Sequence, residues 1–478
     1  MKTPNDAARE LAITTLTKQA PQTNSLVQAF KDAGYKLALV GGPVRDAILG
    51  RLGNDLDFTT DAKPKECEKI LNNWATSVWD VGAAFGTIAG KKGDITVEIT
   101  TYRSESYEKD SRKPTVEFGN SIEGDLSRRD FTINAMALEL TTENPTFIDL
   151  FNGVLDLQNR VIRTPGKPED SFSDDPLRMM RAARFMSQLD FEIDPSVISA
   201  MKSMAKRLEI ISAERIRDEF IKTIMGKRPR LGITLLVETG LADIFLPEVP
   251  KLKLEIDEHH HHKDVYEHSL TVLEQAIALE DRLGGANLTL RLAALLHDIG
   301  KPKTKQLIPG GGVSFHHHEV VGAKMSRQRL RTLRFDNHLI NDISQLVFLH
   351  LRFHGYGSGE WTDSAVRRYV RDAGELLTHL HLLTRADCTT RNKKKADLLA
   401  KTYDELEKRI EVLMQQEELN KIRPDLSGEQ IMEILNIKPS PLVGRAYDFL
   451  LELRLEHGPL GEEKAKTELL NWWQQQKI

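Results

Sequence analysis

The chain has 478 residues, a formal net charge of −4, and 40% hydrophobic and 28% charged residues, a composition typical of globular proteins in water. Its length exceeds what one hydrophobic core usually organises, so we expect three or four modules. There is no uninterrupted apolar run of about 18 residues, no pattern of a secretion signal at the N-terminus and no disulfide framework in the two cysteines. The sequence therefore predicts a cytoplasmic protein without a membrane span.

The first part of the chain predicts a small mixed sheet with helices, which we assign to residues 25–150. Residues 1–24 read as a polar, helical lead-in, and the apolar residues that follow predict a strand running into a turn at Gly41-Gly42. A helix comes next, then a second strand with Asp55-Leu56-Asp57, a helix over 65–72 and a hairpin over 85–102. The charged stretch 104–118 is poor in apolar residues and predicts a mobile loop.

Helical periodicity dominates after residue 150, so the predicted fold class is α+β, a head with a small mixed sheet followed by helical modules. Asp175-Pro176 predicts a helix N-terminus. An acidic and histidine-rich stretch, residues 254–262, separates two helical parts. The expected modules are a helical neck and body at 151–253, a helical domain at 260–395 and a helical tail at 396–478.

The strand with two aspartates suggests a metal site. Carboxylates one residue apart on a strand project to the same side, so Asp55 and Asp57 can share divalent metal ions. Before them, Gly41 and Gly42 let a backbone approach phosphates closely. Glu98, in the hairpin, either completes this carboxylate set or is an exposed glutamate at a strand edge. The constellation indicates phosphoryl or nucleotidyl transfer with divalent metal ions.

Two further blocks carry charged residues suited to a nucleotide. In residues 125–137, Arg128 and Arg129 suit a triphosphate and Asp130 suits a ribose hydroxyl, ahead of a short apolar helix. Further on, Asp175 and Arg178 are three residues apart and share a helix face. An acceptor beside a donor can read the Watson–Crick edges of cytosine and adenine while rejecting uracil and guanine. The alternative is a salt bridge between these two residues at the helix start.

In this order the blocks resemble the motifs of class II tRNA nucleotidyltransferases, the bacterial CCA-adding enzymes. The resemblance implies a head with a five-stranded sheet, and template-independent addition of C, C and A to the 3′ end of tRNA from CTP and ATP, with magnesium at Asp55 and Asp57. The family block commonly begins with Glu-Asp, so Asp174 departs from it and its role stays open. The matching segments are Leu39-Val40-Gly41-Gly42-Pro43-Val44-Arg45-Asp46 with Asp55-x-Asp57, Asp125-x-x-Arg128-Arg129-Asp130-Phe131-Thr132-Ile133-Asn134-Ala135, Asp174-Asp175-Pro176-Leu177-Arg178 and Ser212-Ala213-Glu214-Arg215-Ile216-Arg217.

The residue patterns and the resemblance together give the candidate site residues. The catalytic candidates are Asp55, Asp57 and Glu98. The nucleotide-binding candidates are Gly41, Gly42, Arg45, Arg128, Arg129, Asp130, Asn134, Asp175, Arg178 and Arg181. The net charge argues against indiscriminate binding to polyanions, but local basic clusters such as Arg329, Arg331 and Arg334 can together line an RNA-binding face.

A second constellation lies between residues 260 and 390. His297-Asp298 sits at the end of an apolar helix, with His268 upstream and Asp387 downstream. Mixed nitrogen and oxygen ligands suit a divalent transition metal with open positions for water, which can attack a phosphate ester. The pattern resembles the HD phosphohydrolase superfamily. His318 and His350 occupy places where some HD domains have extra metal ligands; the alternative is that they are ordinary core or surface histidines. His262 is a candidate phosphate contact.

The leading expectation is a tRNA enzyme with two activities, CCA addition in the N-terminal half and phosphohydrolysis in the HD domain. One alternative is a relative that adds only A, only CC, or a poly(A) tract. An alternative of another class is an HD phosphohydrolase whose N-terminal half merely binds tRNA. The presence of both Asp55 and Asp57 argues against that last hypothesis.

Overall fold

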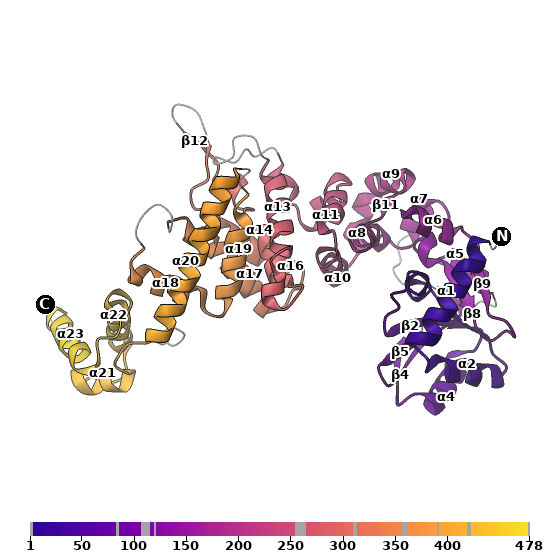
Figure 1. Ribbon diagram of the computed structural model, residues 1–478, viewed down its shortest axis with the longest axis horizontal. Coiled ribbons are helices and arrows are strands. Elements are labelled where there is room, and N and C mark those ends of the chain that lie inside the picture. Colours follow the sequence, from indigo (N-terminus) through magenta and orange to yellow (C-terminus); the bar gives the residue numbers. More distant parts are fainter. Residues whose placement is uncertain are drawn as a thin grey trace. The chain divides into compact units, whose positions relative to one another are not determined.

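The computed structural model describes residues 3–82, 86–106, 115–118, 121–253, 264–308, 313–355, 361–389, 392–417 and 422–476. The chain divides into two compact units, Met1–Phe245 and Leu246–Ile478, and Figure 1 shows the elements of each. Within the described segments, no helix has both the length and the apolar character needed to cross a bilayer. The predicted linker 254–262, including His262, falls outside the described residues.

A mixed sheet of seven strands forms the head of the first unit, in the order β3-β4-β5-β2-β1-β8-β9. Strands β2 and β5 are parallel and all other neighbours are antiparallel. The sheet is wider than the five strands implied by the family resemblance, because hairpin partners extend it at both edges, β3 on β4 and β9 on β8. The bounds are β1 Leu37–Val40, β2 Asp55–Thr60, β3 Ser77–Gly82, β4 Thr87–Lys92, β5 Ile95–Thr101, β8 Met136–Glu139 and β9 Thr146–Asp149.

Two local predictions for the head are wrong. The apolar segment expected to be a helix after Asp130 contains a 3₁₀ turn, Thr132–Asn134, and then β8, which is buried along its whole length. A short apolar run fits a buried strand as well as a buried helix, so periodicity cannot distinguish them. The stretch expected to be a mobile loop contains an antiparallel ribbon of β6 (Arg103–Ser106) and β7 (Thr115–Phe118); the residues between these strands lie outside the described set.

Helices complete the first unit. The predicted helical lead-in is confirmed as α1 (Pro4–Gln19), which opens with a capping box at Thr3 and packs against α3 (Gly42–Ile48). Further along, α8 (Leu177–Leu189) packs against two later helices, and a Cβ at Gly232 would lie 2.7 Å from the Ala183 carbonyl oxygen, so close packing there requires glycine. The other helices are α2 Thr23–Asp32, α4 Pro64–Trp74, α5 Ile122–Ser127, α6 Gly153–Asn159, α7 Pro168–Asp174, α9 Pro195–Met204, α10 Ala213–Ile224, α11 Pro229–Glu238 and α12 Ala242–Phe245. A two-residue parallel bridge joins β10 (Val161–Ile162) to β11 (Glu192–Ile193).

The described residues of the second unit form helices and one short strand pair, β12 (Gln306–Leu307) and β13 (Val313–Ser314). Side-chain caps start several helices: Asp264 begins α13 (Val265–Ile277), Asn287 begins α14 (Leu288–Leu296) and Asp336 begins α17 (Asn337–Leu349). Helices α13, α14, α17 and α19 pack on one another and position the histidine cluster described below. The remaining helices are α15 Lys301–Thr304, α16 His318–Thr332, α18 Asp363–Ala373, α19 Leu377–Asp387, α20 Lys393–Glu417, α21 Gly428–Leu435, α22 Pro441–His457 and α23 Glu462–Gln475.

The end of the chain has its own small core. Ile431 of α21, Leu450 of α22 and Leu469 of α23 are buried together. Trp472 stacks on Phe449 with ring centroids 5.2 Å apart, so this tryptophan packs inside the tail.

Candidate active site and metal centre

The turn between β1 and α3 requires glycine and brings the chain close to an arginine. Gly41 has a φ of 72°, a left-handed conformation that residues with a side chain rarely adopt. A Cβ at this position would lie 2.7 Å from the Nη1 atom of Arg129. The predicted phosphate-approach turn therefore lies directly against one of the predicted triphosphate arginines.

One buried carboxylate holds both of these arginines. Asp125 Oδ1 accepts a hydrogen bond from Arg128 Nη2 at 2.7 Å, and Oδ2 accepts one from Arg129 Nη2 at 3.1 Å. Burial opposes ionisation of Asp125, but the charges of Arg129 and Arg128 outweigh it and keep the pKa of this carboxyl below its usual value. The two guanidinium groups are thus oriented in advance, and both side chains remain about a fifth exposed.

Asp130 lies at the centre of a buried network instead of facing an open pocket. Its Oδ1 accepts hydrogen bonds from the Phe131 N–H (2.8 Å) and Asn134 Nδ2 (3.0 Å), and its Oδ2 accepts from Arg181 Nε at 2.6 Å. Burial opposes ionisation, but Arg181 and the Asn134 hydrogen bond dominate and lower the pKa of Asp130 to about 2. Arg45 joins this network by donating to Asn134 Oδ1 at 2.6 Å. A direct contact between Asp130 and a ribose hydroxyl would require one of these bonds to open.

The three candidate catalytic carboxylates occupy adjacent strands. Asp55 and Asp57 are the exposed positions of β2, alternating with buried residues as expected, and Glu98 is an exposed residue of β5 in register with Asp57. Although Asp57 is open to solvent, partial desolvation raises its pKa to about 6; Arg129 opposes this shift, and Glu98 and Asp55 reinforce it. Among the described residues, the oxygens of Asp55, Asp57 and Glu98 do not come together in a ready-made cluster of metal ligands. That suits magnesium, which is commonly bound by one or two carboxylates together with substrate phosphates.

The candidate base-reading residues lie at the start of α8, each with its own partners. Asp175 Oδ1 accepts the Leu177 N–H at 3.0 Å, and Oδ2 is 2.8 Å from Arg215 Nη2. Arg178 donates to Ser171 Oγ at 2.8 Å and to the Arg128 carbonyl at 2.6 Å. Asp175 and Arg178 therefore bind separate partners, and the salt bridge at the helix start joins Asp175 to Arg215.

Arg215 is the residue that sequence reasoning missed. It belongs to the Ser212-Ala213-Glu214-Arg215 block, which was recognised as a motif without a role for any of its side chains. Its pairing with Asp175 joins residues 40 positions apart, so local pattern alone could not reveal it. Asp174, the residue that departs from the family pattern, is the exposed last residue of α7.

Six buried or nearly buried side chains of the second unit converge into two groups that can hold metal ions. The first group contains His268, His297 and Asp387, and the second contains Asp298, His318 and His350. In each group the ligand atoms lie within 4.8 Å of one another. Asp298 also lies 3.1 Å from His297 Nε2, so it adjoins both groups. The two histidines that the sequence left undecided therefore face the same centre as the predicted four.

The outer hydrogen bonds prepare these histidines to bind metal. The Nδ1 atoms of His297, His318 and His350 lie 2.6–2.8 Å from backbone carbonyls, and His268 Nδ1 contacts Thr389 Oγ1 at 3.2 Å. A carbonyl only accepts, so the three Nδ1 atoms carry hydrogen and leave Nε2 for a metal. The Nε2 atoms face each other in pairs, 3.3 Å apart in both groups.

The charges at this centre favour a bound cation. Burial opposes protonation of His297, but Asp298 and Asp387 outweigh it and raise the pKa of His297 to about 10, so a metal that binds at Nε2 has to displace a proton there. Burial also opposes ionisation of the two aspartates, yet His297 keeps the pKa of both well below the usual value. Burial instead lowers the pKa of His350 to about 3, which keeps its ring neutral, as a metal ligand must be. The donor set and its charges fit divalent metal ions.

The chain thus joins a mixed-sheet head, with carboxylates and arginines at its candidate site, to a helical domain that carries a histidine-aspartate centre. Comparison with known families supports each part. Residues 37–163 match the "Poly A polymerase head domain", residues 190–252 the "Probable RNA and SrmB-binding site of polymerase A", and residues 265–392 the "HD domain". The chain thus resembles poly A polymerases in its head and HD proteins in its helical domain.

The chain is also similar to CCA-adding enzymes, which confirms the resemblance seen in the sequence. It is 43% identical over 219 residues to that of Lactobacillus helveticus, covering 46% of this chain and 53% of the relative. It is 37% identical over 260 residues to that of Ligilactobacillus salivarius, covering 54% and 63%. The match thus spans about half to three-fifths of these relatives.

Solved structures extend the likeness to the whole fold. The Bacillus stearothermophilus CCA-adding enzyme in complex with CTP aligns over 100% of this chain and 99% of its own, with a TM-score of 0.69 and 25% identity. The Thermotoga maritima CCA-adding enzyme complexed with tRNA aligns over 94% of both chains, with a TM-score of 0.59 and 20% identity, a likeness of fold. The predicted α+β class, with a mixed-sheet head and helical domains after it, is confirmed.

Proposed function

We propose that the head adds C, C and A to the 3′ end of tRNA, using CTP and ATP. The observation that carries this proposal is the arrangement at Asp125: two arginines held by one buried carboxylate against the Gly41 turn, close enough for an Arg129 nitrogen to fill the space of a Gly41 side chain. Such a cluster suits the phosphates of a nucleoside triphosphate. The chain's full-length likeness to a CCA-adding enzyme solved with CTP supports the same substrate class.

The carboxylates of β2 are proposed to hold magnesium. Asp55 and Asp57 would bind it, and Glu98 stands in register beside Asp57 to complete the set. Bound magnesium would neutralise the charge that develops on the phosphates. Around it, Arg128 and Arg129 bind and orient the triphosphate, so that the terminal tRNA hydroxyl attacks the α-phosphorus and pyrophosphate leaves.

Base selection is proposed to rest on Asp175 and Arg178. Asp175 accepts from the exocyclic amino group of cytosine or adenine, and Arg178 donates to the neighbouring ring nitrogen. Uracil and guanine present a carbonyl and an N–H at these places, which leaves both protein groups without a matching partner. Arg215 and the Leu177 N–H orient Asp175, while Ser171 and the Arg128 carbonyl orient Arg178.

We further infer that the HD domain is a metal-dependent phosphohydrolase with a divalent transition metal. The convergence of His268, His297 and Asp387 beside a second group, Asp298, His318 and His350, supports this proposal. Metal bound there would activate water against a phosphate ester. The nitrogen-rich ligands favour a transition metal over magnesium.

Asp55→Ala tests the division into two sites. With magnesium, CTP, ATP and a tRNA transcript that lacks its 3′ terminal CCA, we expect the wild type to extend the transcript and the variant to lose extension. Hydrolysis of nitrophenyl phosphate by the variant should stay at the wild-type level, because the HD ligands belong to the second unit. Loss of both activities in a folded variant would show that the two-site division is wrong. Loss of neither would show that Asp55 holds no catalytic metal.

A further inference from the structure

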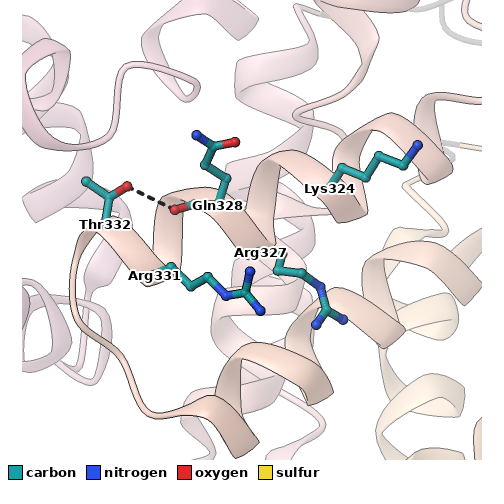
Figure 2. Close-up of a pocket in the computed structure, with 5 residues that line it drawn as sticks. All are labelled: Lys324, Arg327, Gln328, Arg331 and Thr332. Carbon is teal, nitrogen blue, oxygen red and sulfur yellow. Dashed lines mark hydrogen bonds between the residues drawn. The ribbon is translucent and has the colours of Figure 1, made fainter.

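Helix α16 presents a row of cations on its surface, away from the metal ligands of the same domain. Lys324, Arg327 and Arg331 follow at intervals of three and four residues, so they share one face. With Gln328 and Thr332 they line a shallow hollow of about 420 Å³, and Figure 2 shows these five side chains on the helix. We call these five residues the α16 ridge.

The ridge differs from the ion-paired arginine of the same helix. Arg329 is bound by Glu248, with nitrogen–oxygen distances of 2.9–3.1 Å. Arg327 instead donates to the neutral amide oxygen of Asn341 at 2.7 Å. Among the described residues, no carboxylate forms an ion pair with any of the three ridge cations. In the described part of the chain, the ridge cations therefore have no carboxylate within ion-pair distance.

Acidic groups on the neighbouring helix are engaged elsewhere. Asp342 of α17 lies 3.0 Å from His338, and Asp336 caps the start of α17 through the Leu339 N–H. The helix dipole can explain the position of only some of the ridge cations. Cations are favoured in the last turn of a helix, where Arg331 lies, but the effect fades beyond one turn, and Lys324 is near the middle of α16.

The chemistry of the hollow points to RNA rather than to a protein partner. Protein interfaces concentrate aromatic and apolar residues at their centre. The residues that line this hollow are instead cationic or polar, although the carbon stems of their side chains form most of its wall. Successive phosphates of a nucleic acid match a row of cations. The Gln328 and Thr332 side chains offer hydrogen bonds suited to the 2′-hydroxyls that RNA exposes.

We propose that the α16 ridge binds the phosphate backbone of RNA, and that the RNA is the tRNA on which the head acts. The identity of this RNA rests on the proposed CCA addition, while the phosphate contact itself does not. The first residue of the same helix is His318, a ligand candidate of the metal centre. Lys324 follows six residues later, about 9 Å along the helix axis. A strand held on the ridge would thus be fixed to the helix that supports the metal centre.

The test replaces the three cations together, with Lys324→Gln, Arg327→Gln and Arg331→Gln in one variant. A matched control replaces three exposed lysines of the head, Lys31, Lys63 and Lys65, each by Gln. Both variants change the net charge by the same amount, so a general effect of charge would appear equally in both. Tm and hydrolysis of nitrophenyl phosphate check that the HD domain is folded, since exposed substitutions usually change stability by only about 0.5 kcal/mol.

The measurement is the Kd of a tRNA transcript at several salt concentrations, without CTP or ATP. For the ridge variant we expect binding weaker by roughly tenfold or more at about 0.1 M salt, and a slope of log K against log salt reduced by about two to three, the loss expected for three phosphate contacts. The control variant should bind like the wild type. The proposal is overturned if the ridge variant keeps the wild-type Kd and slope, or if both variants weaken equally. Binding is measured without nucleotides, so it does not depend on CCA addition. If the protein binds tRNA through the ridge but does not extend it, only the proposed CCA addition is refuted.

Discussion

Removing Arg215 should reduce base selectivity and leave stability nearly unchanged. Its guanidinium lies 2.8 Å from Asp175 Oδ2, and half of its side chain is exposed. An ion pair of this kind contributes about 0–1 kcal/mol to the free energy of unfolding, so Arg215→Ala should barely change Tm. Asp175 keeps its bond from the Leu177 N–H but loses the partner that fixes its second oxygen.

The expected loss of selectivity follows from the freedom of this second oxygen of Asp175 to move. A well-placed pair of contacts to a base edge discriminates by about 1–3 kcal/mol. Losing one of the two anchors of Asp175 should cost about 1 kcal/mol, or roughly a fivefold fall in the ratio of kcat/KM for CTP over UTP.

The assay measures single-nucleotide incorporation into a tRNA transcript that lacks its terminal CCA, with CTP and UTP in separate reactions. The matched control is Arg217→Ala, on the same helix α10, because Arg217 pairs with the exposed Asp218. It should keep the wild-type ratio. An unchanged ratio in a folded Arg215→Ala variant would refute the positioning role, and so would an equal fall in the control.

Three other expectations concern the head and the metal centre. Gly41→Ala should cost about 1–2 kcal/mol of backbone strain and place a methyl group against Arg129. Extension of tRNA by the variant should therefore fall sharply, while its phosphatase activity persists. Equal extension by the variant and the wild type would contradict this expectation. The pKa of Asp130 is lowered to about 2, so its pairing with Arg181 contributes about 2 kcal/mol of stability that is present above about pH 4 and lost as the pH falls towards 2. Asp130→Asn should therefore unfold at lower urea concentration at pH 7 and show a flatter dependence on acid pH, and an unaltered pH profile would count against the network. His350→Ala should lower the metal content of chelator-stripped, reloaded protein from two ions per chain to one, as measured by mass spectrometry; retention of both ions would exclude His350 as a ligand.

Local sequence patterns predicted several of the elements that hold the candidate site residues. The alternation of Asp55 and Asp57 on one face of β2 needs only the period of a strand, and the structure has it. Short motifs likewise indicated the glycine turn before α3 and the His297-Asp298 pair at the end of α14. These features depend on residues close in sequence, which is why the sequence alone could indicate them.

Features set by distant residues were missed or mistaken. The apolar run at β8 became a strand because β1 and β9 flank it, and nothing within the run distinguishes strand from helix. The hydrogen bond from Arg181 to Asp130 joins residues 51 positions apart, so the local motif that suggested a ribose contact could not indicate it. The link between Asp175 and Arg215 depends in the same way on the packing of α8 against α10.

The sequence of the nucleotides added to tRNA tests the central claim most directly. Purified protein with magnesium, CTP and ATP should extend a transcript lacking its 3′ end by C, C and A in that order, and should then stop. Addition of C alone, of A alone or of a long A tract would contradict the account and favour a specialised relative or a poly(A) polymerase. No addition by a folded protein would leave the HD phosphohydrolase with a tRNA-binding head as the better explanation.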